Sequence, residues 1–258
     1  MNKYSRQKNI VSFLKENNGA SIKELATVFG VSEMTIRRDL TFLENKKKIK
    51  LVHGAAIFIN DDKITLGEAD YDLHIESVKQ SMEKLKIGQF AASLIEPNDT
   101  IIIDTGTTTE QIAHYLPTDI PITVLCYNMN TLLAISNKPN INIILAGGYY
   151  YKNTQLFQSP EGVRMIRRIR ANKAFLSASG VNQKLGVTCV EQIEVETKAA
   201  AISSSLSRIL VCDSSKFDKI GPSYFAQINE FDAIITDSNI PDDWIEFLNE
   251  SNIRLYTV

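Results

Sequence analysis

The stretch DTGTTTE, residues 104–110, contains residue types suited to hold an anion. It follows the apolar run TIIID and precedes a helical pattern. Glycine lets the backbone approach a ligand closely, threonine hydroxyls donate hydrogen bonds, and a helix N-terminus presents free NH groups. We therefore expect a phosphate site formed by Gly106, Thr107, Thr108 and Thr109, against the simpler alternative of a turn with a threonine cap. The nucleotide patterns GxxxxGK[ST] and GxGxxG are absent from the sequence.

Other polar residues follow apolar runs typical of strands. They are Tyr127-Asn128, Gly147-Gly148, Ser179-Gly180 and Asp213 to Lys216. If the runs form a parallel sheet, these residues lie at its carboxyl edge, where ligands bind. Glu194 and Lys198 are one helical turn apart, which an exposed ion pair would also explain. Asp213 could simply form a turn and Lys216 could be a surface lysine, so spacing alone leaves these roles open.

A second candidate site is the stretch VSEMTIRRDL, which predicts a helix from Ser32 to about Asn45. At 100° per residue, one face is apolar and the opposite face carries Met34, Arg38, Thr41 and Asn45, with Thr35 and Arg37 on its flanks. Arginine suits both contact to guanine and neutralisation of phosphate. The alternative is an ordinary solvated helix face.

The elements before this helix favour DNA binding. A helical pattern over residues 5–16 is followed by the capping box Ser21 to Glu24, a second helical pattern and a turn at Gly30. Helix, turn and helix with an arginine-bearing outer face is the helix-turn-helix plan. The segment ENKKKIKLVHGAAIFI then predicts a β-hairpin wing, from which Lys50 and His53 are candidates to contact DNA. The alternative is that this lysine-rich segment is only a solvated surface.

Charge separates this head from the rest of the chain. Residues 1–60 contain 11 Lys and Arg against 5 Asp and Glu, so their net charge is +6, whereas the whole chain carries −2. A basic N-terminal segment followed by an acidic remainder suggests that the N-terminal segment binds a polyanion. The composition, 44% hydrophobic and 22% charged, is ordinary for a globular protein. Scattered cysteines and histidines indicate no metal site and no disulfide framework, and no cofactor is expected. With no membrane span or signal peptide, we expect a cytoplasmic protein.

The body alternates strands with helices. Strand candidates are TIIID, ITVLC, INIIL, KAFLSA, RILVC, DAIITD and IRLYTV. This alternation predicts an α/β domain with a mostly parallel, doubly covered sheet. We expect a DNA-binding domain over residues 1–59, a linker over 60–72 and the α/β domain over 73–258, which opens with a long helix to about Glu96.

These motifs resemble those of one protein family. VSEMTIRRDLTFLE followed by VHGAA resembles the winged helix-turn-helix of the DeoR family of bacterial transcriptional regulators. The body resembles that family's sensor domain, which is similar in fold to ribose-5-phosphate isomerase and binds phosphorylated sugars. The matching pieces are DTGTTT, Asn128, AGG ending at Gly148, EVETKAA with Glu194 and Lys198, and CDSSKF with Asp213 and Lys216. The resemblance implies that the threonines hold the phosphate and that Asp104 and Lys216 contact the sugar.

We therefore expect a repressor of a carbohydrate-utilisation operon whose affinity for double-stranded operator DNA is controlled by a phosphorylated sugar. A single reading head binds weakly, so a homodimer or homotetramer is expected. The alternative is a sugar-phosphate isomerase with an accessory basic domain, in which Asp104, Asp213 and Lys216 would do acid-base chemistry. A nonspecific nucleic-acid binder is a third hypothesis.

Overall fold

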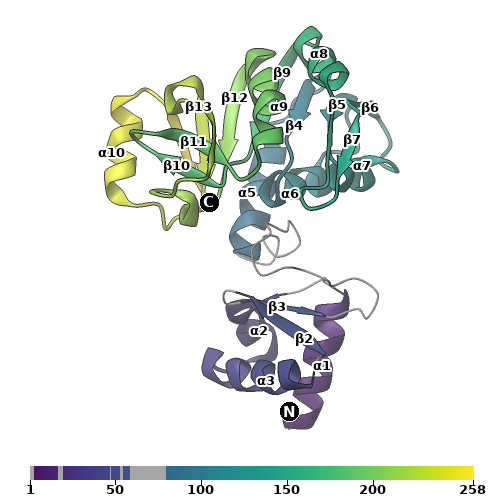
Figure 1. Ribbon diagram of the computed structural model, residues 1–258, viewed down its shortest axis with the longest axis vertical. Coiled ribbons are helices and arrows are strands. Elements are labelled where there is room, and N and C mark those ends of the chain that lie inside the picture. The colour runs from purple at the N-terminus through teal and green to yellow at the C-terminus, as the bar shows by residue number, and fades with distance from the viewer. Residues whose placement is uncertain (1–2, 17–19, 47, 53–54, 59–79) are drawn as a thin grey trace. The chain divides into compact units, whose positions relative to one another are not determined.

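A computed structural model describes residues 3–16, 20–46, 48–52, 55–58 and 80–258 (Figure 1). The chain divides into two compact units, residues 1–82 and 83–258. The expected linker, residues 60–72, and the first part of the expected long helix lie outside the described residues.

The first unit packs three helices against a small sheet. The predicted helices are α1 (Lys3–Glu16), α2 (Ile22–Phe29) and α3 (Glu33–Asn45), and the predicted hairpin is β2 (Ile49–Val52) with β3 (Ala55–Phe58). A short strand that the sequence did not reveal, β1 (Ala20–Ser21), pairs antiparallel with β3. The core gathers apolar residues from the three helices and the sheet, including Ile10, Leu14, Leu25, Ile36 and Leu40.

Local signals determine how α2 leads into α3. Ser21 Oγ accepts from the Glu24 NH at 3.1 Å, and the Glu24 carboxylate accepts from the Ser21 NH at 3.4 Å, which completes the predicted capping box. Gly30 ends α2 with φ of 62°, a left-handed conformation that favours glycine. Ser32 then caps α3 by accepting from the Thr35 NH at 3.3 Å. These caps confirm the predicted helix-turn-helix.

The second unit is built on a parallel sheet of seven strands. All seven predicted strands are present. The central ones are short apolar runs that the sheet buries on both faces, while the two edge strands are partly exposed. Their order across the sheet is β15 (Arg254–Thr257), β14 (Ala233–Thr236), β12 (Ser205–Val211), β9 (Ala171–Leu176), β4 (Thr100–Ile103), β5 (Ile122–Cys126) and β6 (Ile141–Leu145).

Helices cover both faces of this sheet, as predicted. Alternate residues of a strand point to opposite faces, so Ile101 and Ile103 join one apolar cluster and Ile102 joins the other. The first cluster includes residues of α5 (Ser81–Ser93), α6 (Thr107–Tyr115) and α7 (Met129–Ile135). The second includes residues of α8 (Pro160–Arg168), α9 (Gln192–Ser203) and α10 (Asp242–Glu250).

The structure moves several predicted boundaries. The sequence predicts a helix that starts near Thr109, but α6 begins at Thr107, so the three threonines form its first turn. Helix α5 ends at Ser93, since the NH groups of Leu94 and Ile95 bond to carbonyls three residues back. The sequence predicts a helix over residues 191–206, but α9 ends at Ser203 because the next residues enter β12.

Two small sheets were not predicted as such. One contains β10 (Gly180–Asn182), β11 (Gly186–Cys189) and β13 (Ser223–Ala226), and it lies beside α10 (Figure 1). The other is a hairpin of β7 (Tyr149–Tyr151) and β8 (Leu156–Gln158). The strands of both sheets have three or four residues, which is too short for a clear periodic pattern.

The cysteines are core residues. All three are buried thiols, as the apolar runs ITVLC and RILVC predict for Cys126 and Cys212. Burial raises the pKa of Cys126 and of Cys189 to about 12, so neither is a thiolate near neutral pH. Across the described parts of the chain, no helix is long and apolar enough to span a bilayer.

Candidate functional site

Helix α3 presents the predicted polar face to solvent. Met34 is 60% exposed, and Arg38 and Thr41 are also exposed, while Ile36 and Leu40 are fully buried on the opposite side. Thr35 lies half-buried at the edge of this face. The unit therefore offers the outer face of α3 as a continuous surface that can enter a groove.

The remaining candidates of this unit differ in what they already contact. Arg37 lies on a flank with a guanidinium nitrogen 4.0 Å from the Glu33 carboxylate, an exposed pair worth little in stability. The Ser32 hydroxyl caps α3 and lies 2.9 Å from the Thr35 hydroxyl. Lys50 belongs to β2, but its side chain and the whole of His53 lie outside what the structure describes.

Asp39 is a buried carboxylate on α3 that sequence reasoning missed. It is 1% exposed, and its two oxygens accept from Arg6 Nε at 2.6 Å and from Gln7 Nε2 at 2.8 Å. Both donors lie on α1, so these bonds fix α3 against α1. An acidic residue at the border of the apolar face was the available signal, but its partners are 33 and 32 residues away.

In the second unit, the chain first adds strands to one side of β4 and then, starting with β9, adds them to its other side. From β4 the chain adds β5 and β6 on one side, then returns to place β9, β12, β14 and β15 on the other. Ligands of such sheets bind at this point, beyond the carboxyl ends of the strands. Asp104 follows β4 and Ser177 follows β9, so both lie at this position.

Asp104 is the centre of a buried polar cluster. It is fully buried, and its Oδ1 accepts from the Tyr127 hydroxyl at 2.8 Å. Its Oδ2 accepts from the Ser177 NH at 2.8 Å and the Ser177 hydroxyl at 3.0 Å, and it forms an ion pair with Lys198. Burial and the neighbouring Asp104 carboxylate raise the pKa of Tyr127 well above its usual value, so Tyr127 donates as a neutral phenol.

Lys198 is buried, and the possibility of an exposed ion pair with Glu194 is wrong. Its side chain is 1% exposed, because α9 packs this face against the sheet. Its ammonium donates to the Ser177 carbonyl at 3.1 Å and lies 3.5 Å from the Glu194 carboxylate. Burial alone would lower the pKa of Lys198, but Asp104 and Glu194 outweigh it and raise that pKa above its usual value. Burial raises the pKa of Glu194, despite the nearby lysine.

The first turn of α6 adjoins this cluster. Its N-cap is Gly106, with φ of 151°, and a Cβ there would lie 2.4 Å from the Ser177 hydroxyl, so only glycine fits. Glycine has no side chain that could cap the NH groups of the helix. Thr107, Thr108 and Thr109 are all buried, and the Thr109 hydroxyl donates to the Gly106 carbonyl at 2.9 Å.

Asn128 and Gly148 shape the same edge. Asn128 caps α7 by accepting from the Thr131 NH at 2.8 Å, and its amide donates to the Asp104 carbonyl at 3.3 Å. At Gly148 a Cβ would lie 2.4 Å from the Gln158 carbonyl, so glycine lets the chain fold back into the β7–β8 hairpin.

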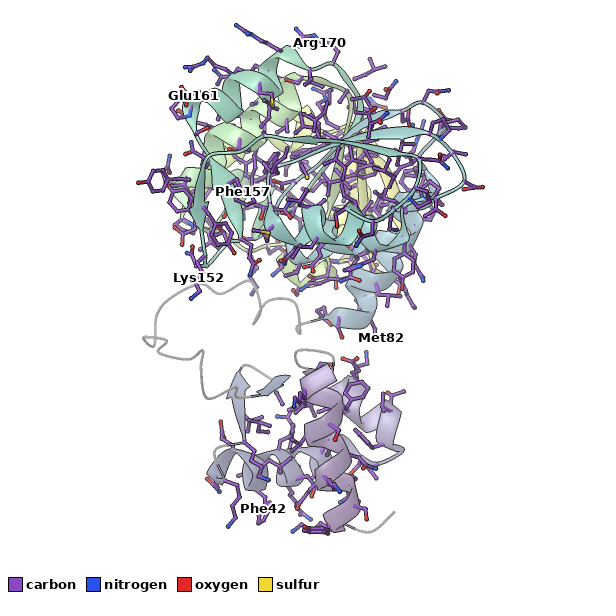
Figure 2. All side chains as sticks on the ribbon, turned by 90° about the vertical axis from the view of Figure 1, so that its right-hand side faces the viewer. Phe42, Met82, Lys152, Phe157, Glu161 and Arg170 are labelled. Carbon is purple, nitrogen blue, oxygen red and sulfur yellow. The ribbon has the colours of Figure 1, made fainter. Side chains whose placement is uncertain are left out.

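The β7–β8 hairpin lies against the carboxyl ends of β4 and β5. The Thr105 hydroxyl donates to the Thr154 carbonyl at 3.1 Å, and the Phe157 NH donates to the Tyr127 carbonyl at 2.7 Å. Figure 2 labels Lys152 and Phe157 of this hairpin. The hairpin also reaches α9, because the Asn153 amide donates to the Glu191 carboxylate at 3.0 Å.

Asp213 and Lys216 lie at the same edge but apart from Asp104. Asp213 follows β12, two strands from β4, and therefore roughly 10 Å away. Its Oδ1 accepts from the Ser215 NH at 3.2 Å, while its buried Oδ2 has no partner among the described residues. Lys216 ends the short helix η1 (Ser214–Lys216) and is half-buried. The structure thus connects Asp104, Asn128, Glu194 and Lys198 by direct contacts, and it leaves this pair at a distance.

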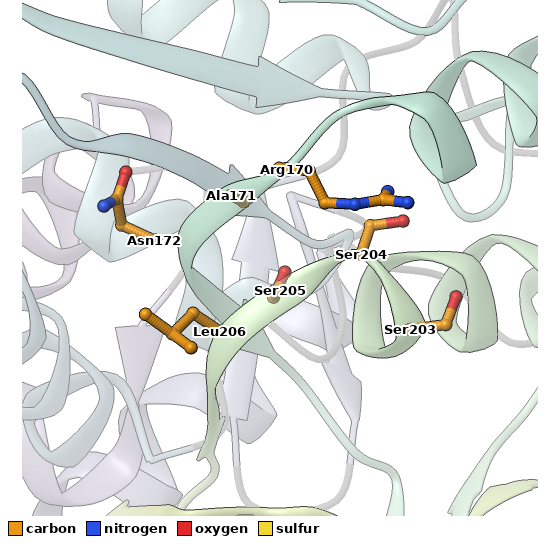
Figure 3. Close-up of a pocket in the computed structure, with 7 residues that line it drawn as sticks. All are labelled: Arg170, Ala171, Asn172, Ser203, Ser204, Ser205 and Leu206. Atoms are coloured by element: carbon orange, nitrogen blue, oxygen red, sulfur yellow. The ribbon is translucent and has the colours of Figure 1, made fainter.

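A pocket of about 430 Å³ lies at the other edge of the sheet. Its lining comes from the starts of β9 and β12 and the end of α9, and includes Arg170, Asn172, Ser204 and Leu206 (Figure 3). Since it lies at the amino ends of the strands, it contains none of the predicted ligand residues.

Comparison with known families places both units. The model of the DeoR-like helix-turn-helix domain matches residues 6–62, and that of the DeoR C terminal sensor domain matches residues 79–238. The chain belongs to the DeoR family. It is a DNA-binding transcriptional regulator of this family.

Curated members of the DeoR family align with nearly the whole chain. The deoxyribose operon repressor of Escherichia coli (strain K12) is 31% identical over 245 residues, which are 94% of this chain and 93% of the repressor. The HTH-type transcriptional regulator IolR of Bacillus subtilis (strain 168) is 29% identical over 254 residues, 98% of this chain and 99% of IolR. Both alignments therefore span both units of this chain.

Among solved structures, ribose 5-phosphate isomerase A of Methanocaldococcus jannaschii is 13% identical to this DeoR-family chain, with a TM-score of 0.38. The alignment covers 52% of this chain and 53% of the isomerase. A likeness this weak assigns no chemistry to the sensor unit.

Proposed function

We propose that the chain is a repressor of an operon for carbohydrate use, and that a phosphorylated sugar bound at the carboxyl edge of the sensor sheet controls its affinity for operator DNA. The observation that best supports a phosphorylated ligand is the first turn of α6. There, a helix N-terminus capped by glycine lies beside a lysine-containing buried cluster at the switch point of the sheet.

The phosphate would lie on the first turn of α6. NH groups at a helix N-terminus and the positive end of the helix dipole favour a dianion, and hydroxyls of Thr107 and Thr108 add donors. Gly106 lets this turn pack directly against Ser177, which joins the proposed phosphate site to the Asp104 cluster.

The sugar would extend from there toward β12. Buried Asp213 Oδ2 is an acceptor without a partner among the described residues, so a ligand hydroxyl that donates to it would remove the cost of an unpaired buried group. Asp104 holds the other end of the site together, because both of its oxygens already accept from protein groups. In this proposal Asp104, Asn128, Glu194 and Lys198 position the site, while the α6 turn, Asp213 and Lys216 contact the ligand.

The DNA-binding units of two chains would act as a pair. One α3 offers few base contacts, so specific binding calls for a homodimer or homotetramer on repeated half-sites. A ligand can alter DNA affinity only if it binds one arrangement of the heads more tightly than another. The similarity to the deoxyribose operon repressor supports repression rather than activation.

The test is a thermal-shift titration with a panel of pentose and hexose phosphates and with inorganic phosphate. We expect at least one sugar phosphate to raise the melting temperature of the wild-type chain. We expect Thr107→Val to lose that shift while operator binding in a mobility-shift assay is preserved. Thr118→Val, at an exposed threonine, is the matched control and should respond like wild type. A normal shift in Thr107→Val would exclude the α6 turn as the phosphate site.

A further inference from the structure

Phe42 is a large apolar side chain at the edge of the outer face of α3, on the same flank as Thr35. It is 44% exposed, whereas the apolar residues around it on α3, Ile36, Leu40 and Leu43, are buried. Four residues after Arg38, it is rotated only about 40° from that arginine around the helix axis. Figure 2 shows it at the outside of the first unit. The face that offers Arg38 to DNA therefore also offers an aromatic ring.

Two lysine ammonium groups flank this ring. Lys3 Nζ, from the first turn of α1, lies 5.6 Å from the ring centroid, and Lys46 Nζ, at the end of α3, lies 5.9 Å from it. Both distances are within the range of a cation–π contact. Lys3 belongs to a different helix from Phe42, so the ring and its two positively charged neighbours come together only in the folded unit.

We propose that Phe42 packs against the 5-methyl group of a thymine in the operator, while Lys3 and Lys46 hold the phosphates beside it. An apolar side chain in the major groove reads the thymine methyl, and ammonium groups neutralise phosphate without reading sequence. The inference rests on DNA binding by α3, and it adds a specificity-determining residue that is not arginine. A protein partner would use the aromatic ring, but it would have no need of two cations at its rim.

The experiment replaces thymine by uracil, which removes only the 5-methyl group. A binding site is first selected from random duplex DNA with the full-length wild-type chain, and each thymine of that site is then changed in turn. We expect uracil at one or two positions to weaken wild-type binding about fourfold, the equivalent of one buried methyl group. Phe42→Ala should lose this sensitivity at those positions and keep it elsewhere.

Matched variants separate this role from a general one. Val28→Ala, at an apolar residue of α2 that is 52% exposed, should keep the wild-type uracil pattern. Lys3→Gln and Lys46→Gln should weaken binding to all sequences and each reduce the salt slope by about one. If Phe42→Ala unfolds the unit, Phe42→Gln tests the same contact with a good helix former.

Each outcome decides the proposal. An unchanged uracil pattern in Phe42→Ala overturns it, and the same pattern together with a changed sedimentation coefficient assigns Phe42 to contact between copies of the chain. Failure to select any site would instead remove sequence-specific DNA binding, and with it both this inference and the repressor proposal.

Discussion

Replacing Lys198 by methionine should destabilise the sensor unit strongly. The lysine side chain is 1% exposed and its ammonium lies between two carboxylates, Asp104 at 0% and Glu194 at 8% exposure. Methionine has a similar length and fits an apolar gap, so the change removes the charge and its hydrogen bonds without a large change in volume. It leaves two buried carboxylates without a counter-charge.

Removing one partner of a buried ion pair costs about 3–5 kcal/mol. In a domain of this size each kcal/mol lowers the melting temperature by about 2–4 °C, so we expect a loss of roughly 6–20 °C. The pKa of Glu194 is already raised by burial, and without the lysine its charged form is still less favourable. Acid protonates Glu194 and relieves the repulsion, so the deficit should be smaller at pH 5 than at pH 7.

The assay is thermal unfolding followed by circular dichroism at the two pH values. Lys184→Met, at an exposed lysine, is the control and should melt like wild type. The double variant Lys198→Met/Asp104→Asn should recover part of the loss, because it removes one of the uncompensated charges. A loss below 3 °C that is the same at both pH values would refute the argument that Lys198 balances buried carboxylates.

Three further predictions concern both units. Raising the pH above about 10.4 should destabilise the wild-type sensor unit more than Lys198→Met. The raised pKa of Lys198 stabilises the fold fully below the unfolded pKa, and this contribution is lost progressively as the pH rises from there toward the folded pKa. Urea titrations at pH 8 and 11 would measure the difference, and an equal loss in both chains would contradict it. Asp39→Ala should lower operator affinity at least tenfold in a mobility-shift assay, since α3 loses its bonds to α1, and unchanged affinity would show that other contacts hold the helix. Arg38→Ala should weaken binding to the operator by about 1–3 kcal/mol and change binding to random DNA little, whereas Arg37→Ala should weaken binding to both and lower the salt slope. Fluorescence anisotropy would measure both affinities, and equal effects of the two variants would mean that neither arginine reads bases.

Local sequence patterns predicted the three helices and the hairpin of the first unit and the seven strands of the large sheet. The capping box at Ser21, the left-handed turn at Gly30 and the cap at Ser32 depend on residues within one helical turn of each other, so they can be predicted locally. The seven strands were predictable for a similar reason, because each is a run of apolar residues that suits a sheet covered on both faces. The outward face of α3 followed from helical periodicity alone.

Which residues contact one another could be learned only from the packing of the elements. Asp104 is bonded to Ser177 and Lys198, which are 73 and 94 residues away, and no local pattern encodes such distances. That packing turned Lys198 from a candidate surface charge into a buried one. It also brought Lys3 of α1 to the Phe42 ring and folded β7 and β8 over the strand ends. Periodicity shows which side of an element is buried, but the partner on that side is set by how the elements pack.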